Sequence, residues 1–454
     1  MFHFLLLFAL GLPSTSRSES GLRIHPGQVR LSGPTSRQSL LIGLLEDGRW
    51  LGSPKTSATW QARDAGIVEV RDGVAVPVGD GETRLTASVN GHEVSVPVRV
   101  SGYDRPVDFS FRNNVQPILA KAGCSSGACH GAAAGKNGFK LSLRGYDDQG
   151  DFLALTRQAF GRRMVPSDPG RSLLLTKPTG ALPHKGGTRF DVDSPEYRVL
   201  SGWIAAGAPG PAESDPRIER IEVLPGKVTL APGDQQPFLV QAYFNDGHVE
   251  DVTRWAKYTS ANESVVRVNE LGEVEVAGYG EGAITAWYLS RIAIATVTVP
   301  YANTLEPTLF SKARRRNFID EMTLSKLEEL RLPPSPRSSD SEFLRRVFID
   351  TIGTLPTDAD ARRFLESNEP GKRDELTDSL LEREEFVDYW SYRWSDLLLV
   401  SSKNLPRSAM WSYYRWIREQ VRSNVPWDAL VRSIVTARGS TLSNGAGNFF
   451  MLHD

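Results

Sequence analysis

Apolar and polar residues alternate in two stretches that lie far apart in the chain. Residues 94–100 alternate strictly, and residues 293–299 nearly do. Turn dipeptides such as Asp47-Gly48 and Asp246-Gly247 separate the apolar runs around them. Strict alternation places every second side chain on one face of a strand, and Asp-Gly is typical of tight hairpins. Both stretches therefore predict half-buried β-strands joined by short turns.

The two stretches belong to a repeated unit. Residues 25–29 (His-Pro-Gly-Gln-Val) reappear as residues 224–228 (Leu-Pro-Gly-Lys-Val), which is an offset of 199 residues. The Gly-x-Gly-Glu at residues 79–82 reappears at residues 278–281 with the same offset. A different segment separates the copies, so this is not a tandem solenoid. Short strands at this spacing predict a β-sandwich in each copy.

The order of motifs within each copy resembles the bacterial Ig-like group 2 domain. A Pro-Gly start is followed by an Asp-Gly hairpin, an aromatic residue before a Val-x-Val run, and a Gly-x-Gly-Glu. The resemblance covers residues 22–101 and 217–300. It implies two all-β Ig-like sandwiches that act as spacers or as adhesion surfaces.

Both cysteines of the chain lie between the copies, within residues 105–211. They form the sequence Cys124-Ser-Ser-Gly-Ala-Cys129-His130. Two cysteines closed by a histidine are the minimal signal for covalent haem c, although the usual spacing between them is two residues rather than four. The thiols would bind the porphyrin and the imidazole would ligate the iron. A disulfide between Cys124 and Cys129 or a site for another metal are the alternatives.

Two helices are expected around this motif, at residues 115–122 and 194–207. Together with the motif they resemble a class I cytochrome c, and most closely the planctomycete-type domain. The resemblance implies one covalent haem c, held by Cys124 and Cys129 with His130 as the proximal ligand. His184 is the other histidine of the segment and lies where the distal ligand of that family lies. We therefore expect His184 as the sixth ligand, with Met164 or an open site as alternatives.

The last third of the chain, residues 310–454, changes to a helical pattern. Apolar residues recur at helical spacing from Leu344 and stop at Gly353, and Thr357 is placed to cap the next helix. Residues 346–357 and 388–398 resemble an uncharacterised planctomycete family with a helical domain of unknown function. That family continues with a second haem motif and a further domain. The resemblance therefore implies that this chain is C-terminally truncated.

Charge and the N-terminus narrow the range of functions. The 454 residues include 53 Lys and Arg against 54 Asp and Glu, which argues against a nucleic-acid partner bound by bulk charge. Residues 2–12 are almost all apolar but too few to span a bilayer, so residues 1–20 read as a signal peptide. Membrane anchoring is expected, if at all, only through this segment. No catalytic constellation is recognisable, and enzymatic activity is left undecided.

The sequence as a whole predicts a multidomain protein with two all-β Ig-like sandwiches, an all-α class I cytochrome c-like domain between them, and a C-terminal all-α domain. We expect an exported mono-haem c-type cytochrome of the periplasm or cell envelope, which transfers electrons to an unknown redox protein. The Ig-like units would then be spacers and the helical domain a docking domain. The alternatives are an envelope adhesion or scaffold protein that binds cell-surface polysaccharide or protein, and a fragment of a larger oxidative enzyme.

Overall fold

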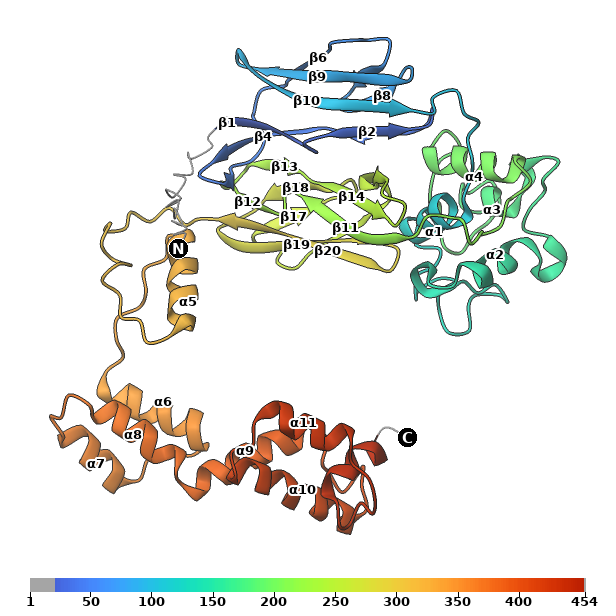
Figure 1. Cartoon of the computed structure of the whole chain (residues 1–454). Coiled ribbons are helices and arrows are strands. Elements are labelled where there is room, and N and C mark those ends of the chain that lie inside the picture. Colours follow the sequence, from blue (N-terminus) through green and yellow to red (C-terminus); the bar gives the residue numbers. More distant parts are fainter. Residues whose placement is uncertain (1–20, 453–454) are drawn as a thin grey trace, which may run out of the picture. The chain divides into compact units, whose positions relative to one another are not determined.

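The computed structural model describes residues 21–452, so the expected signal peptide at residues 1–20 lies outside the described residues. The chain divides into two compact units, of which the first runs to Pro334 and the second begins at Ser335. Sheets dominate the first unit and helices the second (Figure 1). The prediction of β-sandwich-like sheets in the N-terminal part and of a helical domain at the C-terminal end is confirmed.

Ten short strands build the first sandwich. Their order in the sheets is β1-β4-β5, β2-β10-β9-β6 and β3-β8-β7. The strands are β1 (Gly21–His25), β2 (Val29–Ser32), β3 (Gln38–Ser39), β4 (Leu41–Glu46), β5 (Arg49–Trp50), β6 (Thr59–Ala62), β7 (Val68–Arg71), β8 (Val74–Pro77), β9 (Gly81–Val89) and β10 (His92–Ser101).

The second sandwich repeats this topology strand for strand, with the orders β11-β14-β15, β12-β20-β19-β16 and β13-β18-β17. The strands are β11 (Ile218–Leu224), β12 (Lys227–Thr229), β13 (Gln235–Pro237), β14 (Leu239–Phe244), β15 (Val249–Asp251), β16 (Lys257–Ser260), β17 (Val266–Val268), β18 (Glu273–Val276), β19 (Gly280–Tyr288) and β20 (Arg291–Val299).

The registers of the two sandwiches also match. Val98 of β10 pairs in parallel with Val29 of β2, and Val297 of β20 pairs in parallel with Val228 of β12, 199 residues later in both strands. The alternation seen in the sequence now has its cause, because every second side chain of β9 and β10 points into the apolar core. The repeat in the sequence is thus also a repeat of residue pairing where β2 and β9 pair with β10, and where β12 and β19 pair with β20.

Short helices and loops lie between the two sandwiches in the chain. They are η1 (Phe111–Val115), α1 (Gln116–Lys121), η2 (Leu143–Gly145), α2 (Asp148–Thr156), η3 (Gln158–Gly161), η4 (Pro169–Arg171), α3 (Leu173–Thr176) and α4 (Pro195–Ala205). The hydroxyl of Ser194 accepts a hydrogen bond from the N–H of Tyr197 and caps α4. A buried core around Phe111, Leu155 and Trp203 joins these elements. The fold does not establish the finer prediction that this segment is a cytochrome c domain.

The second unit is all helical. Its elements are α6 (Asp340–Ile352), α7 (Asp358–Glu366), α8 (Lys372–Leu381), α9 (Glu384–Leu397), α10 (Arg407–Arg422), α11 (Trp427–Val435) and η6 (Gly445–Leu452). Gly353 ends α6 in the left-handed conformation, with φ of 71°, and Thr357 caps α7 in a capping box. One further helix, α5 (Phe318–Glu329), belongs to the first unit.

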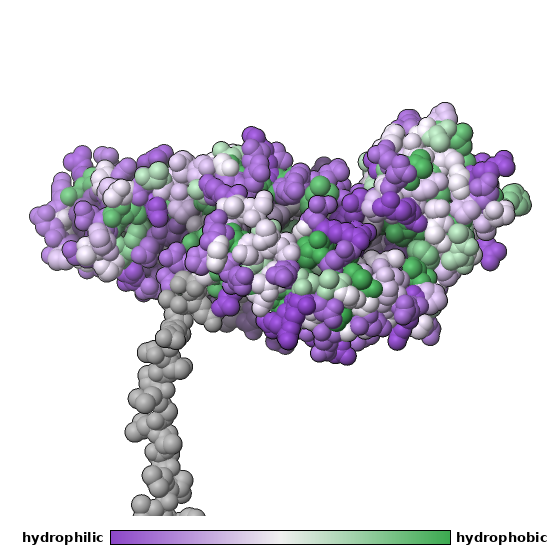
Figure 2. Space-filling view, turned by 90° about the horizontal axis from the view of Figure 1, so that it is seen from above, coloured by the Kyte–Doolittle hydropathy of each residue, from purple (hydrophilic) through white to green (hydrophobic). Residues whose placement is uncertain are grey.

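Hydrophilic residues cover most of the face of the molecule that Figure 2 shows, and apolar residues appear between them in small groups. Within residues 21–452, none of the helices is long and apolar enough to cross a membrane.

Candidate functional site

The cysteine motif folds into a compact loop directly after α1. The N–H of Cys124 donates to the carbonyl of Leu119 (2.8 Å), and the N–H of His130 donates back to the carbonyl of Cys124 (3.0 Å). Between these two bonds, the N–H of Cys129 donates to the carbonyl of Ser126 (3.0 Å). The bonds are possible because Ser-Ser-Gly-Ala is small and turn-forming. The loop therefore holds both thiols and the imidazole close to one end of the helical segment.

The two thiols are free and both are partly buried. Burial raises the pKa of the Cys124 thiol to about 11, because a thiolate loses its hydration there, while the Arg189 charge opposes the shift. The guanidinium of Arg189 lies 3.6 Å from the sulfur of Cys129. Arg189 comes from the loop before α4, and sequence reasoning did not single it out.

The imidazole of His130 is fixed by backbone contacts. Its Nδ1 lies 3.0 Å from the carbonyl oxygen of Phe139, and the two rings are 4.4 Å apart between centroids. Burial lowers the pKa of His130, and the charges of His184, Arg163 and Lys136 lower it further against the effect of the Phe139 carbonyl. The neutral imidazole is therefore favoured.

His184 reaches the same end of the segment from a different loop. Its Nδ1 lies 2.9 Å from the carbonyl oxygen of Gly187, which belongs to its own turn. Its charge acts on the pKa of His130, so the structure brings these two predicted residues into one neighbourhood. Met164, the alternative distal ligand, instead packs against the apolar core of the segment.

Both imidazoles thus direct Nδ1 to a backbone carbonyl, as metal-bound imidazoles commonly do, and this much fits the predicted haem. However, residues 21–452 contain no group of three or more His, Cys, Asp or Glu side chains that could hold a metal ion. Nothing in the contacts of Cys124, Cys129, His130 and His184 tests covalent attachment of haem c. That assignment stays a prediction.

A comparison with known protein families finds a match for the C-terminal part of the chain. Residues 318–453 match the family described as "PSCyt2: Protein of unknown function (DUF1549)". This is less than half of the chain, so the match describes its C-terminal part. No curated protein matches the chain.

Among solved structures, domains 5–6 of the S-layer protein SbsC cover 62% of this chain and 100% of their own, with 11% identity and a TM-score of 0.24. The D00-D0 domain of intimin covers 62% of this chain and 100% of its own, with 9% identity and a TM-score of 0.14. The Yersinia pseudotuberculosis adhesin InvE covers 62% and 59%, with 9% identity and a TM-score of 0.14. Scores this low carry no conclusion about function.

These findings correct the expectation of a planctomycete-type multidomain cytochrome c protein. The family that matches is described as one of unknown function, and this description assigns neither haem nor electron transfer to it. The described residues also show no group of metal ligands. The identification as an electron-transferring mono-haem cytochrome was therefore wrong. A Cys-x4-Cys-His loop is a short motif, and a motif of this length in one loop does not define a class of protein.

The structure instead reveals an interface that the sequence did not predict. Leu41 and Trp50 belong to the first sandwich but are buried in the core cluster of the second, where they are 3% and 4% exposed. Gly52 lies so close that a methyl group on it would be 2.7 Å from the side chain of Leu230. Leu41 and Trp50 therefore form a shared core with the second sandwich, while the other buried apolar residues of the first sandwich form a separate core.

Polar contacts surround this shared core. The amide of Gln241 donates to the Gln38 side-chain oxygen (3.2 Å), and both side chains are buried. The N–H of Ser39 donates to the carboxylate of Asp251 (2.6 Å). Buried amides and a charge-assisted bond fix the relative orientation of two surfaces more strictly than apolar contact does.

The helical segment is joined to the second sandwich as well. The ammonium of Lys121 donates to the carbonyl of Ala256 (2.6 Å), and burial lowers its pKa. The guanidinium of Arg144 lies 3.8 Å from the ring centroid of Trp287, a cation–π distance. The first sandwich and the helical segment therefore each contact the second sandwich through several independent interactions.

A signal for the interface was present in the repeat. Trp50 pairs with Leu45 in the first sandwich, and Val249, which lies 199 residues after Trp50, pairs with Tyr243 in the second. A tryptophan at a position where the other copy has valine marks a difference in surroundings between two otherwise equal units. Sequence patterning shows that such a residue is buried, but not against which domain.

Proposed function

We propose that this chain is a scaffold or adhesion protein of the cell envelope, in which the first unit is a stiff spacer. Its role is to hold surfaces at fixed positions rather than to carry electrons. One observation carries the proposal, namely the burial of Leu41 and Trp50 in the core of the neighbouring sandwich.

Domains joined only by flexible linkers turn freely, and interfaces between them are usually small and polar. Here an apolar core crosses the boundary, and hydrogen bonds and a cation–π contact reinforce it. Bending the unit would expose a tryptophan and break buried hydrogen bonds, so the free energy favours a single arrangement. Such stiffness suits a protein that spans a distance or bears load.

The proposed location is the outside of the cell or the envelope, and the proposed partner is a surface polysaccharide or protein. Repeated β-sandwiches supply edges and loops for recognition without any active site. Because the number of positive charges nearly equals the number of negative charges, binding would depend on local groups instead of net charge.

Protease treatment of intact cells that produce the chain tests its location. We expect the chain to be cleaved while a cytoplasmic control protein survives. Co-sedimentation of the purified chain with isolated envelopes then tests adhesion, with heat-unfolded chain as the control. Protection from protease in intact cells together with absence from the envelope pellet would contradict the proposal.

A further inference from the structure

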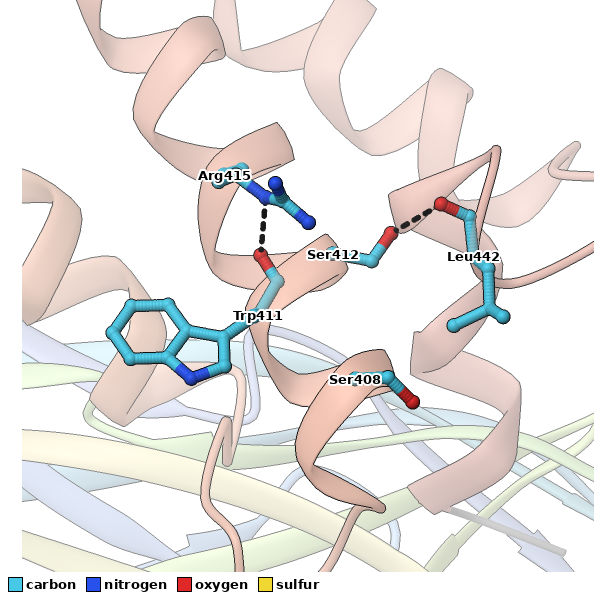
Figure 3. Close-up of a pocket in the computed structure, with 5 residues that line it drawn as sticks. All are labelled: Ser408, Trp411, Ser412, Arg415 and Leu442. Carbon is cyan, nitrogen blue, oxygen red and sulfur yellow. Dashed lines mark hydrogen bonds between the residues drawn. The ribbon is translucent and has the colours of Figure 1, made fainter.

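A pocket of about 570 Å³ lies in the helical unit, whereas the interface described above belongs to the first unit. Four of its lining residues come from successive turns of α10, and the fifth, Leu442, comes from the loop before η6 (Figure 3). The residues are Ser408, Trp411, Ser412, Arg415 and Leu442. Trp411 is 47% exposed.

The indole of Trp411 offers a fixed apolar surface. The ring of Tyr414 meets it edge to face, with centroids 5.8 Å apart and planes at 86°. Trp427, another half-exposed tryptophan of the unit, is instead stacked on Trp394 at 4.3 Å. Trp411 is thus held in place by a neighbour and still presents about half of its surface to solvent.

Arg415 places a positive charge beside this surface. Its Nε donates to the carbonyl of Trp411 (3.2 Å), as Figure 3 shows, which orients the guanidinium. Among the described residues no carboxylate pairs with Arg415, whereas Arg418, one turn later, pairs with Glu384 and Asp388. The two terminal nitrogens of Arg415 therefore remain available for an anion, and their planar fork matches a carboxylate or a sulfate.

Two serines complete the pocket with different roles. The hydroxyl of Ser412 donates to the carbonyls of Thr441 and Leu442 (3.0 Å each), so it ties the loop that carries Leu442 to α10. The hydroxyl of Ser408 has no hydrogen-bond partner among residues 21–452 and is exposed at the pocket. The wall is therefore fixed, and one hydroxyl is left for a ligand.

We propose that this pocket binds an anionic sugar residue of a polysaccharide. The C–H face of the sugar ring would lie on the indole of Trp411, its acid group on Arg415, and one of its hydroxyls on Ser408. A pocket of this kind combines one apolar surface with a few convergent polar groups, which is the usual composition of a small-ligand site. The proposal does not depend on the stiffness of the first unit, so either can fail alone.

Calorimetric titration of the full chain tests the proposal with three probes of equal length. They are an oligogalacturonate, a sulfated oligogalactose and an uncharged oligogalactose. We expect one or both acidic probes to bind at least about tenfold more tightly than the uncharged one, since a hydrogen-bonded ion pair contributes about 1.5–3 kcal/mol. Which acidic probe binds better identifies the acid group.

Variants locate the binding. Arg415→Gln should reduce the affinity for the acidic probe to the affinity for the uncharged one. Trp411→Ala should reduce the affinity for every probe by about tenfold or more. Arg432→Gln changes an exposed arginine outside the pocket and Tyr392→Ala an exposed aromatic residue outside it, and both should leave binding unchanged. If Trp411→Ala misfolds by circular dichroism, Arg415→Gln alone decides. Equal affinity for charged and uncharged probes, unchanged binding by Arg415→Gln, or no binding at millimolar probe would overturn the proposal.

Discussion

Replacing Trp50 with alanine should loosen both sandwiches, although the residue belongs to only one of them. The indole is 4% exposed and packs in the core cluster of the second sandwich. Truncating a buried tryptophan to alanine costs about 3–5 kcal/mol of stability. Within residues 21–452 the indole N–H of Trp50 has no hydrogen-bond partner, and removing a buried unpaired donor returns about 1–3 kcal/mol. Subtracting the middle of the second range, about 2 kcal/mol, from the middle of the first, about 4 kcal/mol, gives an expected net loss of roughly 2 kcal/mol.

Two control variants test whether the lost stability comes from the lost packing, from the unpaired N–H or from the position of the tryptophan. Trp50→Phe keeps an aromatic ring and removes the unpaired N–H, so we expect a loss below about 1.5 kcal/mol. Trp60→Ala makes the same truncation at a partly buried tryptophan that packs only within the core of the first sandwich. It should destabilise the first sandwich and leave the second unchanged.

Amide hydrogen exchange of the full chain, followed by mass spectrometry of peptides, measures the stability of each sandwich separately. In Trp50→Ala the peptides from β19 and β20 should exchange roughly 30-fold faster, which corresponds to about 2 kcal/mol. In Trp60→Ala these peptides should exchange as in the wild type. If Trp50→Ala leaves exchange in β19 and β20 unchanged, the core is not shared and the reasoning fails.

Three other perturbations follow from single contacts. Alkylation of Cys124 by iodoacetamide should accelerate about tenfold per pH unit up to pH 11, because only the thiolate reacts and the pKa of this thiol is about 11. Peptide mapping measures the rate at Cys124, and a plateau of this rate near pH 9 would contradict the prediction. Burial disfavours the charged form of His248, but hydrogen bonds to Glu250 and Asp246 outweigh this and raise its pKa. Its contribution to stability is therefore complete below the unfolded pKa of about 6.5 and is lost as pH rises through the folded pKa. A urea titration series should show this loss in the wild type and not in His248→Gln, and it should be at most about 1 kcal/mol because the partner carboxylates are about half exposed. Gly353→Ala should lower the stability of the helical unit by about 1–3 kcal/mol, because φ is 71° at this position and a methyl group would lie 2.3 Å from the ring of a neighbouring tyrosine. Calorimetry of the full chain measures this loss. An unchanged unfolding transition of the helical unit would exclude the contact.

Much of the fold could be predicted because its signals are local. Alternation of apolar residues determines which side chains of a strand face the core, so residues 94–100 indicated β10. The 199-residue repeat then predicted the second sandwich, and the pairing of Val297 with Val228 follows it. Ser194 and Thr357 indicated helix starts because an N-cap hydroxyl has one local partner.

The interfaces and the pocket could not be predicted in this way. The burial of Leu41 and Trp50 depends on a sandwich that begins well over a hundred residues later, and no local pattern encodes that distance. The exposure of Trp411 depends on which face of α10 the other helices leave uncovered. The cysteine loop shows the opposite error, because a short motif suggested a whole protein class that the comparisons do not support.

Mechanical unfolding of single chains tests the stiff first unit most directly. With the full chain stretched from its two ends, the account predicts that the two sandwiches rupture together, in one event that releases the length of both. In Trp50→Ala the same event should split into two smaller ones at lower force. Two separate ruptures of similar size in the wild type, unaffected by Trp50→Ala, would show that the sandwiches are independent and would contradict the proposed scaffold.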